Sequence, residues 1–350
     1  MQLMKNLTAI TDLTLYTGNF GKSGCRCNCP GCTQTNYGKR NLFSRHQGTI
    51  EQISEILQTL PNLKNAYFLG NPDCSTDPKF CNKASKLFVE NGKNVMFSTS
   101  GIGGVPVLKL IFDELDIHSI KYVSFSIDSM NNSIETLLKG KTFPISSVIS
   151  GIEYCLNLNI PVKIQPTIWQ INQDSYKEII NFFSSNYGIK WFTFHVGSLE
   201  GVKNNFSSIC HHVKPDKWIL ISEKLNSIAL EKNIRMQIPF VFLEENNYYN
   251  YLKDFKPYCM HKNSGLQIWM EKDLRGTFCP ILGDLYPNTY SFDIATGSKY
   301  VNFNKSTICP AIKFLLGSEL FSEFYKNKWI SKTGKTFYPV CRFHSKKINY

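Results

Sequence analysis

A short loop near the amino end carries the residues best suited to metal chemistry. Its sequence, Cys25-Arg-Cys-Asn-Cys29-Pro-Gly-Cys32, places three thiols four and three residues apart, directly after an apolar, strand-like run. Three converging thiolates can hold three irons of a cubane iron–sulfur cluster and leave the fourth iron without a protein ligand, open for chemistry. A fourth thiol, Cys27, interleaves with this set, so four sulfurs binding zinc is a second interpretation.

Alternating patterns of hydrophobicity predict the elements that position this loop. Short β-branched or aromatic runs alternate with segments of helical period, which indicates βα units feeding a mostly parallel sheet. Repeated right-handed crossovers curl such a sheet toward a barrel, whose reactive groups follow the carboxyl ends of strands. We therefore expect an α/β fold, a partial (β/α)6 TIM barrel, with the cysteine loop after its first strand. The expected strands cover residues 13–16, 65–69, 94–98, 122–127, 162–168 and 191–196, and the expected helices cover 49–59, 78–91, 105–113, 146–157 and 173–184.

The pattern changes beyond Val196. A long helix over 215–232 leads to a strand near 235–243, and irregular sequence rich in Asn, Tyr, Gly and Pro follows. Cys259, Cys279, Cys309 and Cys341 lie there, separated by 20, 30 and 32 residues. We expect a barrel domain over 1–213 and a smaller C-terminal region, with a β-hairpin, over 214–350.

Composition narrows the class of protein. With 350 residues, 42% of them hydrophobic, the chain can bury a large core. No apolar run approaches the roughly 18 residues of a spanning helix, and the first residues lack the pattern of a secretory signal, so we expect a cytoplasmic protein. Twelve cysteines then indicate reduced, metal-binding thiols. The net charge of +12 suits a polyanionic partner, but the lysines are scattered along the chain as on a solvated surface.

The cysteine spacing, the βα alternation and the position after the first strand resemble the radical S-adenosylmethionine (radical SAM) superfamily. The resemblance covers most of the chain. It implies a [4Fe-4S] cluster on Cys25, Cys29 and Cys32, S-adenosylmethionine chelated to the open iron, and reductive cleavage to a 5′-deoxyadenosyl radical. It also implies a low-potential electron donor such as flavodoxin or ferredoxin. The Cys-Pro-Gly-Cys form further resembles the activases of glycyl-radical enzymes, which stays an alternative.

Secondary motifs of that superfamily follow successive strands. Gly70-Asn71-Pro72 is similar to the Gly-Glu-Pro segment that receives the methionine amino group, although Asn71 stands where a glutamate is usual. Ser100, in Ser98-Thr-Ser100-Gly101, lies in a segment similar to the Thr-Asn-Gly turn. The resemblance assigns the nucleoside to a set of polar side chains on the fourth and fifth strands and the loop after the fifth: Ser124, Ser126, Asp128, Gln165 and Asn172.

The C-terminal cysteines resemble the ligands of the SPASM and Twitch extensions. Alternating Leu266, Ile268 and Met270 predicts a strand, and the segment from Asp273 to Gly276 has the residues of a tight turn. In the relatives such a hairpin carries an auxiliary iron–sulfur cluster. The resemblance implies an auxiliary [4Fe-4S] cluster held by Cys259, Cys279, Cys309 and Cys341.

Three classes of function stay open. The leading hypothesis is a radical SAM oxidoreductase that abstracts hydrogen from a ribosomally made peptide, with epimerisation, thioether formation or carbon–carbon crosslinking as the outcome. Cys74 and Cys210, both on loops after predicted strands, are candidate hydrogen donors to a substrate radical. The second is a radical SAM dehydrogenase or epimerase of an aminosugar or nucleoside. The third is a zinc-stabilised nucleic-acid-binding protein, which is disfavoured because the sequence lacks an aromatic stacking platform and a grouped arginine face.

Overall fold

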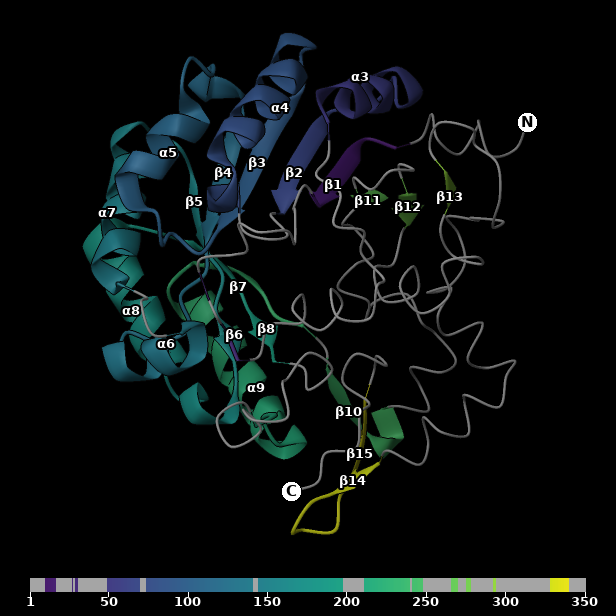
Figure 1. Ribbon diagram of the computed structural model, residues 1–350. Coiled ribbons are helices and arrows are strands. Elements are labelled where there is room, and N and C mark those ends of the chain that lie inside the picture. The colour runs from purple at the N-terminus through teal and green to yellow at the C-terminus, as the bar shows by residue number, and fades with distance from the viewer. Residues whose placement is uncertain are drawn as a thin grey trace.

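A large curved sheet organises the computed structural model, which describes residues 10–16, 27, 29–30, 49–69, 74–140, 144–197, 211–239, 241–247, 266–269, 275–277, 292–293 and 328–339. Its strands follow the order β13-β12-β11-β1-β2-β3-β4-β5-β7-β9, and every neighbouring pair from β11 to β9 is parallel. The helices between these strands lie along one side of the sheet (Figure 1). This arrangement confirms the expected partial barrel. The strands are β1 Asp12–Tyr16, β2 Asn65–Leu69, β3 Asn94–Thr99, β4 Ile120–Phe125, β5 Val162–Ile164, β7 Trp191–Thr193 and β9 Arg235–Gln237.

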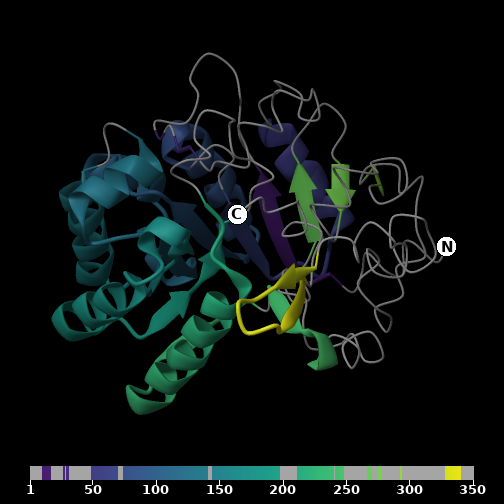
Figure 2. The same cartoon turned by 90° about the horizontal axis from the view of Figure 1, so that it is seen from below.

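Amphipathic helices cover the outer face of this sheet. The Thr49 hydroxyl accepts from the Gln52 N–H and the Gln52 side chain accepts from the Thr49 N–H, which confirms the predicted capping box. Figure 2 shows the helices wrapped around the curve, with α9 extending from it. No helix within the described ranges is long and apolar enough to cross a membrane. The helices are α3 Ile50–Thr59, α4 Pro78–Glu90, α5 Gly104–Phe112, α6 Asn132–Lys139, α7 Ile145–Asn157, α8 Tyr176–Tyr187 and α9 Pro215–Glu231.

The two faces of the sheet differ in burial. Phe68 and Phe97 are fully buried, and their rings pack together on the helix side, where Phe88 of α4 and Phe112 of α5 contact them. The alternate positions of β2 and β3 are only half-buried. Because side chains alternate along a strand, these half-buried residues line the concave face. The hydrophobic core of the described residues therefore lies between the sheet and the helices.

The C-terminal part adds strands to this scaffold. β11 (Leu266–Trp269) and β12 (Arg275–Thr277) pair antiparallel, as the hairpin prediction expects, and β11 also pairs in parallel with β1, while β13 (Phe292–Asp293) extends the edge. A separate sheet of β10 (Phe242–Glu244), β15 (Thr336–Pro339) and β14 (Trp329–Ile330) lies with β10 against α9 (Figure 2). β9 and β11 both lie beyond residue 213 yet join the barrel sheet. The domain boundary expected there stays a prediction.

Three predicted strands are interrupted. The strand expected over 162–168 divides into β5 and β6 (Thr167–Ile168), and the strand over 191–196 divides into β7 and β8 (His195–Val196). Pro166 and Pro239 lack the N–H that an uninterrupted ladder needs, and Pro239 separates β9 from β10. β6 and β8 pair with each other, which carries polar residues past the end of the main sheet.

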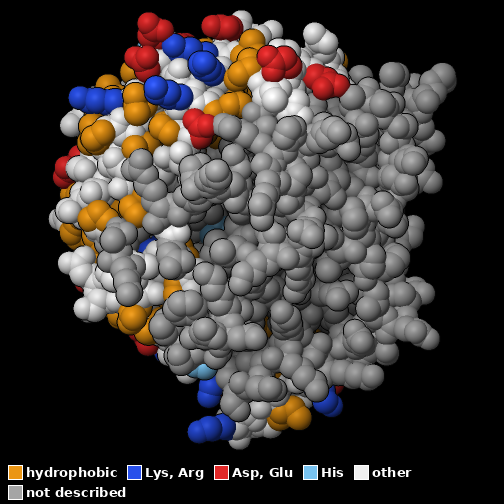
Figure 3. Space-filling model, viewed as in Figure 1, with side chains coloured by type: hydrophobic (Ala, Val, Ile, Leu, Met, Phe, Trp, Pro, Cys, Tyr) orange, Lys and Arg blue, Asp and Glu red, His pale blue; other side chains and the backbone are white. Residues whose placement is uncertain are grey.

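On the face shown in Figure 3, basic and acidic side chains of the described residues are interspersed. Such a surface lacks the grouped basic patch that nucleic-acid binding favours, at least among the described residues of that face.

Candidate functional site

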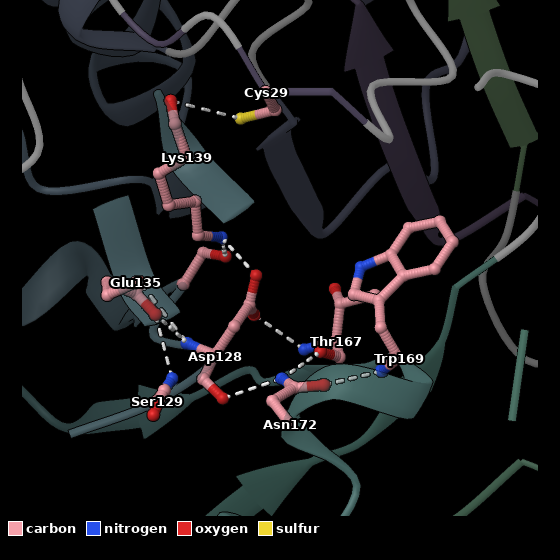
Figure 4. A network of polar contacts seen from close by, with 9 residues as sticks. Cys29, Asp128, Ser129, Glu135, Lys139, Thr167, Trp169 and Asn172 are labelled. Carbon is pink, nitrogen blue, oxygen red and sulfur yellow. Dashed lines mark hydrogen bonds and ion pairs between the residues drawn. The ribbon is translucent and has the colours of Figure 1, made fainter. Parts of the chain in front are cut away.

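Polar side chains gather at the carboxyl ends of the strands β4, β5 and β7. Figure 4 shows that they come from the segment after β4, from α6 and from the segment around β6, with Cys29 of the cysteine loop beside the end of α6. The carboxyl ends of parallel strands meet at one edge of a sheet, which is where α/β proteins bind ligands. The site therefore lies where the fold predicts it.

A buried ion pair forms its centre. The Lys139 Nζ lies 2.8 Å from the Asp128 Oδ2, and both residues are almost fully buried. Lys139 also donates to the Ser126 hydroxyl, and the Thr167 N–H donates to the Asp128 Oδ1 at 2.6 Å. Burial lowers the pKa of Lys139, but the charges of Asp128 and Glu135 more than reverse this effect, so its pKa is raised. Both carboxylate oxygens of Asp128 are thus engaged within the protein.

Glu135 holds the turn that follows β4. Its carboxyl group accepts hydrogen bonds from the N–H groups of Asp128, at 3.0 Å, and Ser129, at 2.7 Å. Burial, and then the charge of Asp128, raise the pKa of Glu135 to about 8, although Lys139 and the two N–H groups oppose this shift. Buried carboxyl groups with strongly shifted pKa values are concentrated at functional sites.

Asn172 ties this turn to the fifth strand. Its Nδ2 donates to the carbonyl oxygens of Asp128, at 2.7 Å, and Thr167, at 2.9 Å, while its Oδ1 accepts from the Trp169 N–H at 2.6 Å. Asn172 is 1% exposed, so all three bonds are shielded from water. Side chain and backbone together fix the relative position of the two strand ends.

A second chain of polar groups crosses the inner face. The Ser124 Oγ donates to the Gln165 Oε1 at 2.6 Å, and the Gln165 Nε2 shares a hydrogen bond with the His195 Nε2. Gln165 and His195 are half-buried. This chain links the ends of β4, β5 and β7 across the mouth of the barrel.

Cys29 brings the cysteine loop to this site. Its half-buried thiol donates to the Lys139 carbonyl oxygen at 3.7 Å, at the last residue of α6. Gly140 ends that helix with φ 103°, a conformation that favours glycine. Cys27, in contrast, packs against the hydrophobic core. Among the described residues no three His, Cys, Asp or Glu side chains gather as metal ligands; Cys25 and Cys32 lie outside those residues.

The structure brings together the predicted residues Ser124, Ser126, Asp128, Gln165 and Asn172. Ser100 lies at the end of β3, where its hydroxyl accepts weakly from the Ile102 N–H at 3.5 Å. Cys74 begins the short helix η1 (Cys74–Thr76) after β2, with a 1% exposed side chain. The other predicted site residues lie outside the described residues: Cys25, Cys32, Gly70, Asn71, Pro72, Cys210, Cys259, Cys279, Cys309 and Cys341.

Six residues of the network were not predicted as site residues: Ser129, Glu135, Lys139, Thr167, Trp169 and His195. Helix α6 was not expected either, because it has only eight residues. A local signal existed, since the Asn131 side chain caps α6 by accepting from the N–H groups of Ser133 and Ile134. The ion pair itself has no such signal, because it depends on how α6 folds back over β4.

This chain is similar to known proteins in structure but not detectably in sequence. No family model and no curated protein matches the sequence. The structure of Streptococcus suis SuiB bound to S-adenosylmethionine aligns with a TM-score of 0.57 and 12% identity, over 83% of this chain and 64% of that chain. The complex of SuiB with the precursor peptide SuiA gives 0.56 and 12%, over 81% and 63%. This chain thus spans less than two thirds of SuiB.

The structure of anSMEcpe with bound AdoMet, which is S-adenosylmethionine, aligns with a TM-score of 0.57 and 13% identity, over 81% of this chain and 78% of that chain. At such low identity the likeness concerns the arrangement of the backbone. The chain has the fold of these two proteins.

Proposed function

We propose that this protein is a radical SAM enzyme that reductively cleaves S-adenosylmethionine and abstracts a hydrogen atom from a peptide. A [4Fe-4S] cluster on Cys25, Cys29 and Cys32 would supply the electron for that cleavage. The observation that carries the proposal is the position of Cys29 beside the polar network at the carboxyl edge of the barrel. Structures with this fold hold S-adenosylmethionine.

The donor set fits such a cluster, since thiolates are its usual protein ligands. The Cys29 sulfur is half-buried at the mouth of the barrel, whereas Cys27 packs against the core. This difference supports Cys29, and not Cys27, as the ligand.

The chain's own residues would orient the nucleotide. Asp128, Lys139, Glu135 and Asn172 satisfy one another, so they act as a rigid support for the strand ends. Gln165 is half-buried at the mouth and is better placed to contact the nucleoside directly. A preorganised mouth of this kind positions reacting groups without reorganisation cost.

A peptide substrate is supported by the two neighbours. SuiB was solved with the precursor peptide SuiA, and anSMEcpe with the Cp18Cys and Kp18Cys peptides. A flavodoxin or ferredoxin would be the electron donor.

An auxiliary [4Fe-4S] cluster on Cys259, Cys279, Cys309 and Cys341 is part of the proposal. The antiparallel pairing of Gln267 with Thr277 supports it, because the chain enters β11 and leaves β12 at the same end of the hairpin. In the sequence Cys259 comes before β11, and Cys279 follows β12 by two residues.

Anaerobic reconstitution tests the first cluster. The wild type should bind about eight irons, for two cubanes, and form 5′-deoxyadenosine with dithionite and S-adenosylmethionine. Replacing Cys25, Cys29 and Cys32 together by alanine should abolish this product and remove about four irons, while the matched Cys27→Ala variant should keep both. Product formation by the triple variant, or a colourless zinc-containing wild type, would refute the proposal.

Substrate class needs its own measurement. Short peptides encoded next to the gene should change mass or stereochemistry when incubated with the reduced enzyme and S-adenosylmethionine. Turnover of an aminosugar or nucleoside, with no change in any peptide, would show the small-molecule activity instead. Cys279→Ala should lower iron to about four and abolish turnover while keeping cofactor cleavage.

A further inference from the structure

A buried lysine lies on the inner wall of the barrel, below the polar mouth. Lys163 is the middle residue of β5 and is paired with Ser124 of β4, so its side chain shares the concave face with Gln165, about 7 Å further along the strand. Its Nζ lies 4.4 Å from the ring centre of Tyr122, 5.4 Å from Tyr67 and 5.5 Å from Trp191. Aromatic rings from β2, β4 and β7 thus surround one ammonium group.

This ammonium has no acidic partner within the described part of the chain. Lys163 is 6% exposed, and neither an ion pair nor a hydrogen bond from its Nζ forms with a described residue. The charge that acts on Lys163 is also positive: it belongs to Arg235 of β9, whose guanidinium carbon lies 4.1 Å from the centre of the Trp191 ring. Burial, and then Arg235, lower the pKa of Lys163 to about 8.

The acidic group on the first strand is already engaged. Asp12 of β1 accepts from the Asn65 Nδ2 at 2.8 Å and from the Thr11 hydroxyl at 2.7 Å, and its charge bears on Tyr122. An unpaired buried ammonium is costly unless a ligand supplies the opposite charge.

A second polar group beside this lysine lacks a partner. The Tyr67 hydroxyl is buried, and no hydrogen bond to a described residue satisfies it. The Ser98 and Ser124 hydroxyls lie near enough to lower the pKa of Tyr67, although neither makes a hydrogen bond of regular geometry with its hydroxyl. Burial dominates and raises this pKa to about 12. The Tyr67 hydroxyl is therefore neutral and can donate a hydrogen bond, and the Lys163 ammonium lies over the ring that carries it. Cation–π contact with the rings accounts for the position of the lysine, but it leaves this hydroxyl unexplained.

We propose that Lys163 and the Tyr67 hydroxyl form an anion-binding subsite in the barrel interior, which receives a carboxylate of the substrate. One ammonium and one hydroxyl match a singly charged group. A phosphate dianion would need a second cation at the same point, and the Arg235 guanidinium lies over the Trp191 ring instead. The positive edges of the aromatic rings suit a carboxylate as well. The inference rests on the proposed function in one respect, which is that it takes the ligand to be the substrate. A peptide substrate would present an acidic side chain or its C-terminal carboxylate.

Acetate is the probe that tests this subsite. The full-length, reconstituted protein would be labelled with ¹⁵N at lysine side chains, and the Nζ signal of Lys163 assigned by its loss in Lys163→Met. At pH 6.5 the ammonium is protonated, and sodium acetate should shift this signal saturably while acetamide, the neutral analogue, should not. Tyr67→Phe keeps the ring and removes only the hydroxyl, so it should weaken acetate binding at least threefold. Lys121→Met, at an exposed lysine of β4, should leave binding unchanged.

A shift that fails to saturate, or equal acetate affinity in the wild type and in Tyr67→Phe, would overturn the subsite. Equal or tighter binding of chloride or inorganic phosphate would overturn the assignment to a carboxylate. This titration needs neither cluster reduction nor cofactor cleavage, so its outcome is independent of whether S-adenosylmethionine is cleaved.

Discussion

The two faces of the barrel strands differ in the side chains that they carry and in what those side chains contact. On the outer face, alternate residues such as Phe68, Phe97 and Val123 are fully buried against the helices. On the inner face the residues are mostly polar or aromatic: Tyr67, Ser98 and Gln165 are half-buried, and Ser124 and Lys163 are buried. The period of two along a strand lets one segment supply the core and the site at once. Stability should therefore respond mainly to outer substitutions, and ligand binding to inner ones.

Adjacent residues of β3 give the largest expected contrast. Phe97→Ala should lower the free energy of unfolding by about 3–5 kcal/mol, because it leaves a cavity among Phe68 and Phe112. Met96→Ala, on the inner face, should cost less than about 1.5 kcal/mol, since Met96 is already half-exposed. Urea unfolding measures both. Similar losses would show that the inner face is packed as tightly as the outer one.

The buried ion pair between Asp128 and Lys139 is an exception to this division between the two faces, because it is polar and yet should contribute to stability. Asp128→Asn leaves the buried Lys139 ammonium without its ion-pair partner, and we expect the free energy of unfolding to fall by about 3 kcal/mol. In Asp128→Asn/Lys139→Met both charges are absent, so much of the loss should be recovered. A double variant no more stable than the single one would contradict this account.

Lys163 lies on the inner face, and we expect its buried ammonium to lower the free energy of unfolding. Its pKa of about 8 in the folded protein lies below the value near 10.4 of an unfolded chain, so between these values the unfolded state binds more protons. The free energy of unfolding of the wild type should therefore rise across that window relative to Lys163→Met, by about 2–3 kcal/mol. Below pH 8 the variant should be the more stable protein.

Denaturant unfolding at a series of pH values measures this difference. The exposed Lys121→Met serves as the control and should differ from the wild type by an amount that does not vary with pH. A pH-independent difference for Lys163→Met would refute the lowered pKa.

The smallest effect on stability is expected at the end of β8, where Gly197 lies close to the Trp169 ring. A Cβ on Gly197 would lie 2.3 Å from the Trp169 ring, so Gly197→Ala should cost about 1–2 kcal/mol through overpacking. Combining it with Trp169→Leu should make the alanine nearly neutral. Additive losses in the double variant would show that the ring is not the obstacle.

Much of the fold was predictable because its signals are local. The strands β1 to β4 and helices α3, α4 and α7 lie within a few residues of their predicted positions, since hydrophobic period, caps and turn residues act over short stretches. Prolines explain why two longer strands are divided. Of the site, the residues Ser124, Ser126, Asp128, Gln165 and Asn172 were predicted. Glu135 and Lys139, which are 7 and 11 residues from Asp128, were not, because no local pattern shows how α6 folds back over β4.

The sequence by itself determined the order of strands and helices, the place of the cysteine loop after the first strand, and which face of each strand is apolar. Only the tertiary structure decided that Lys139 pairs with Asp128, that β11 lies beside β1, and that rings from three strands surround Lys163. The physical reason is that strand register and helix packing set these contacts cooperatively over the whole sheet, whereas periodicity and capping are properties of short segments.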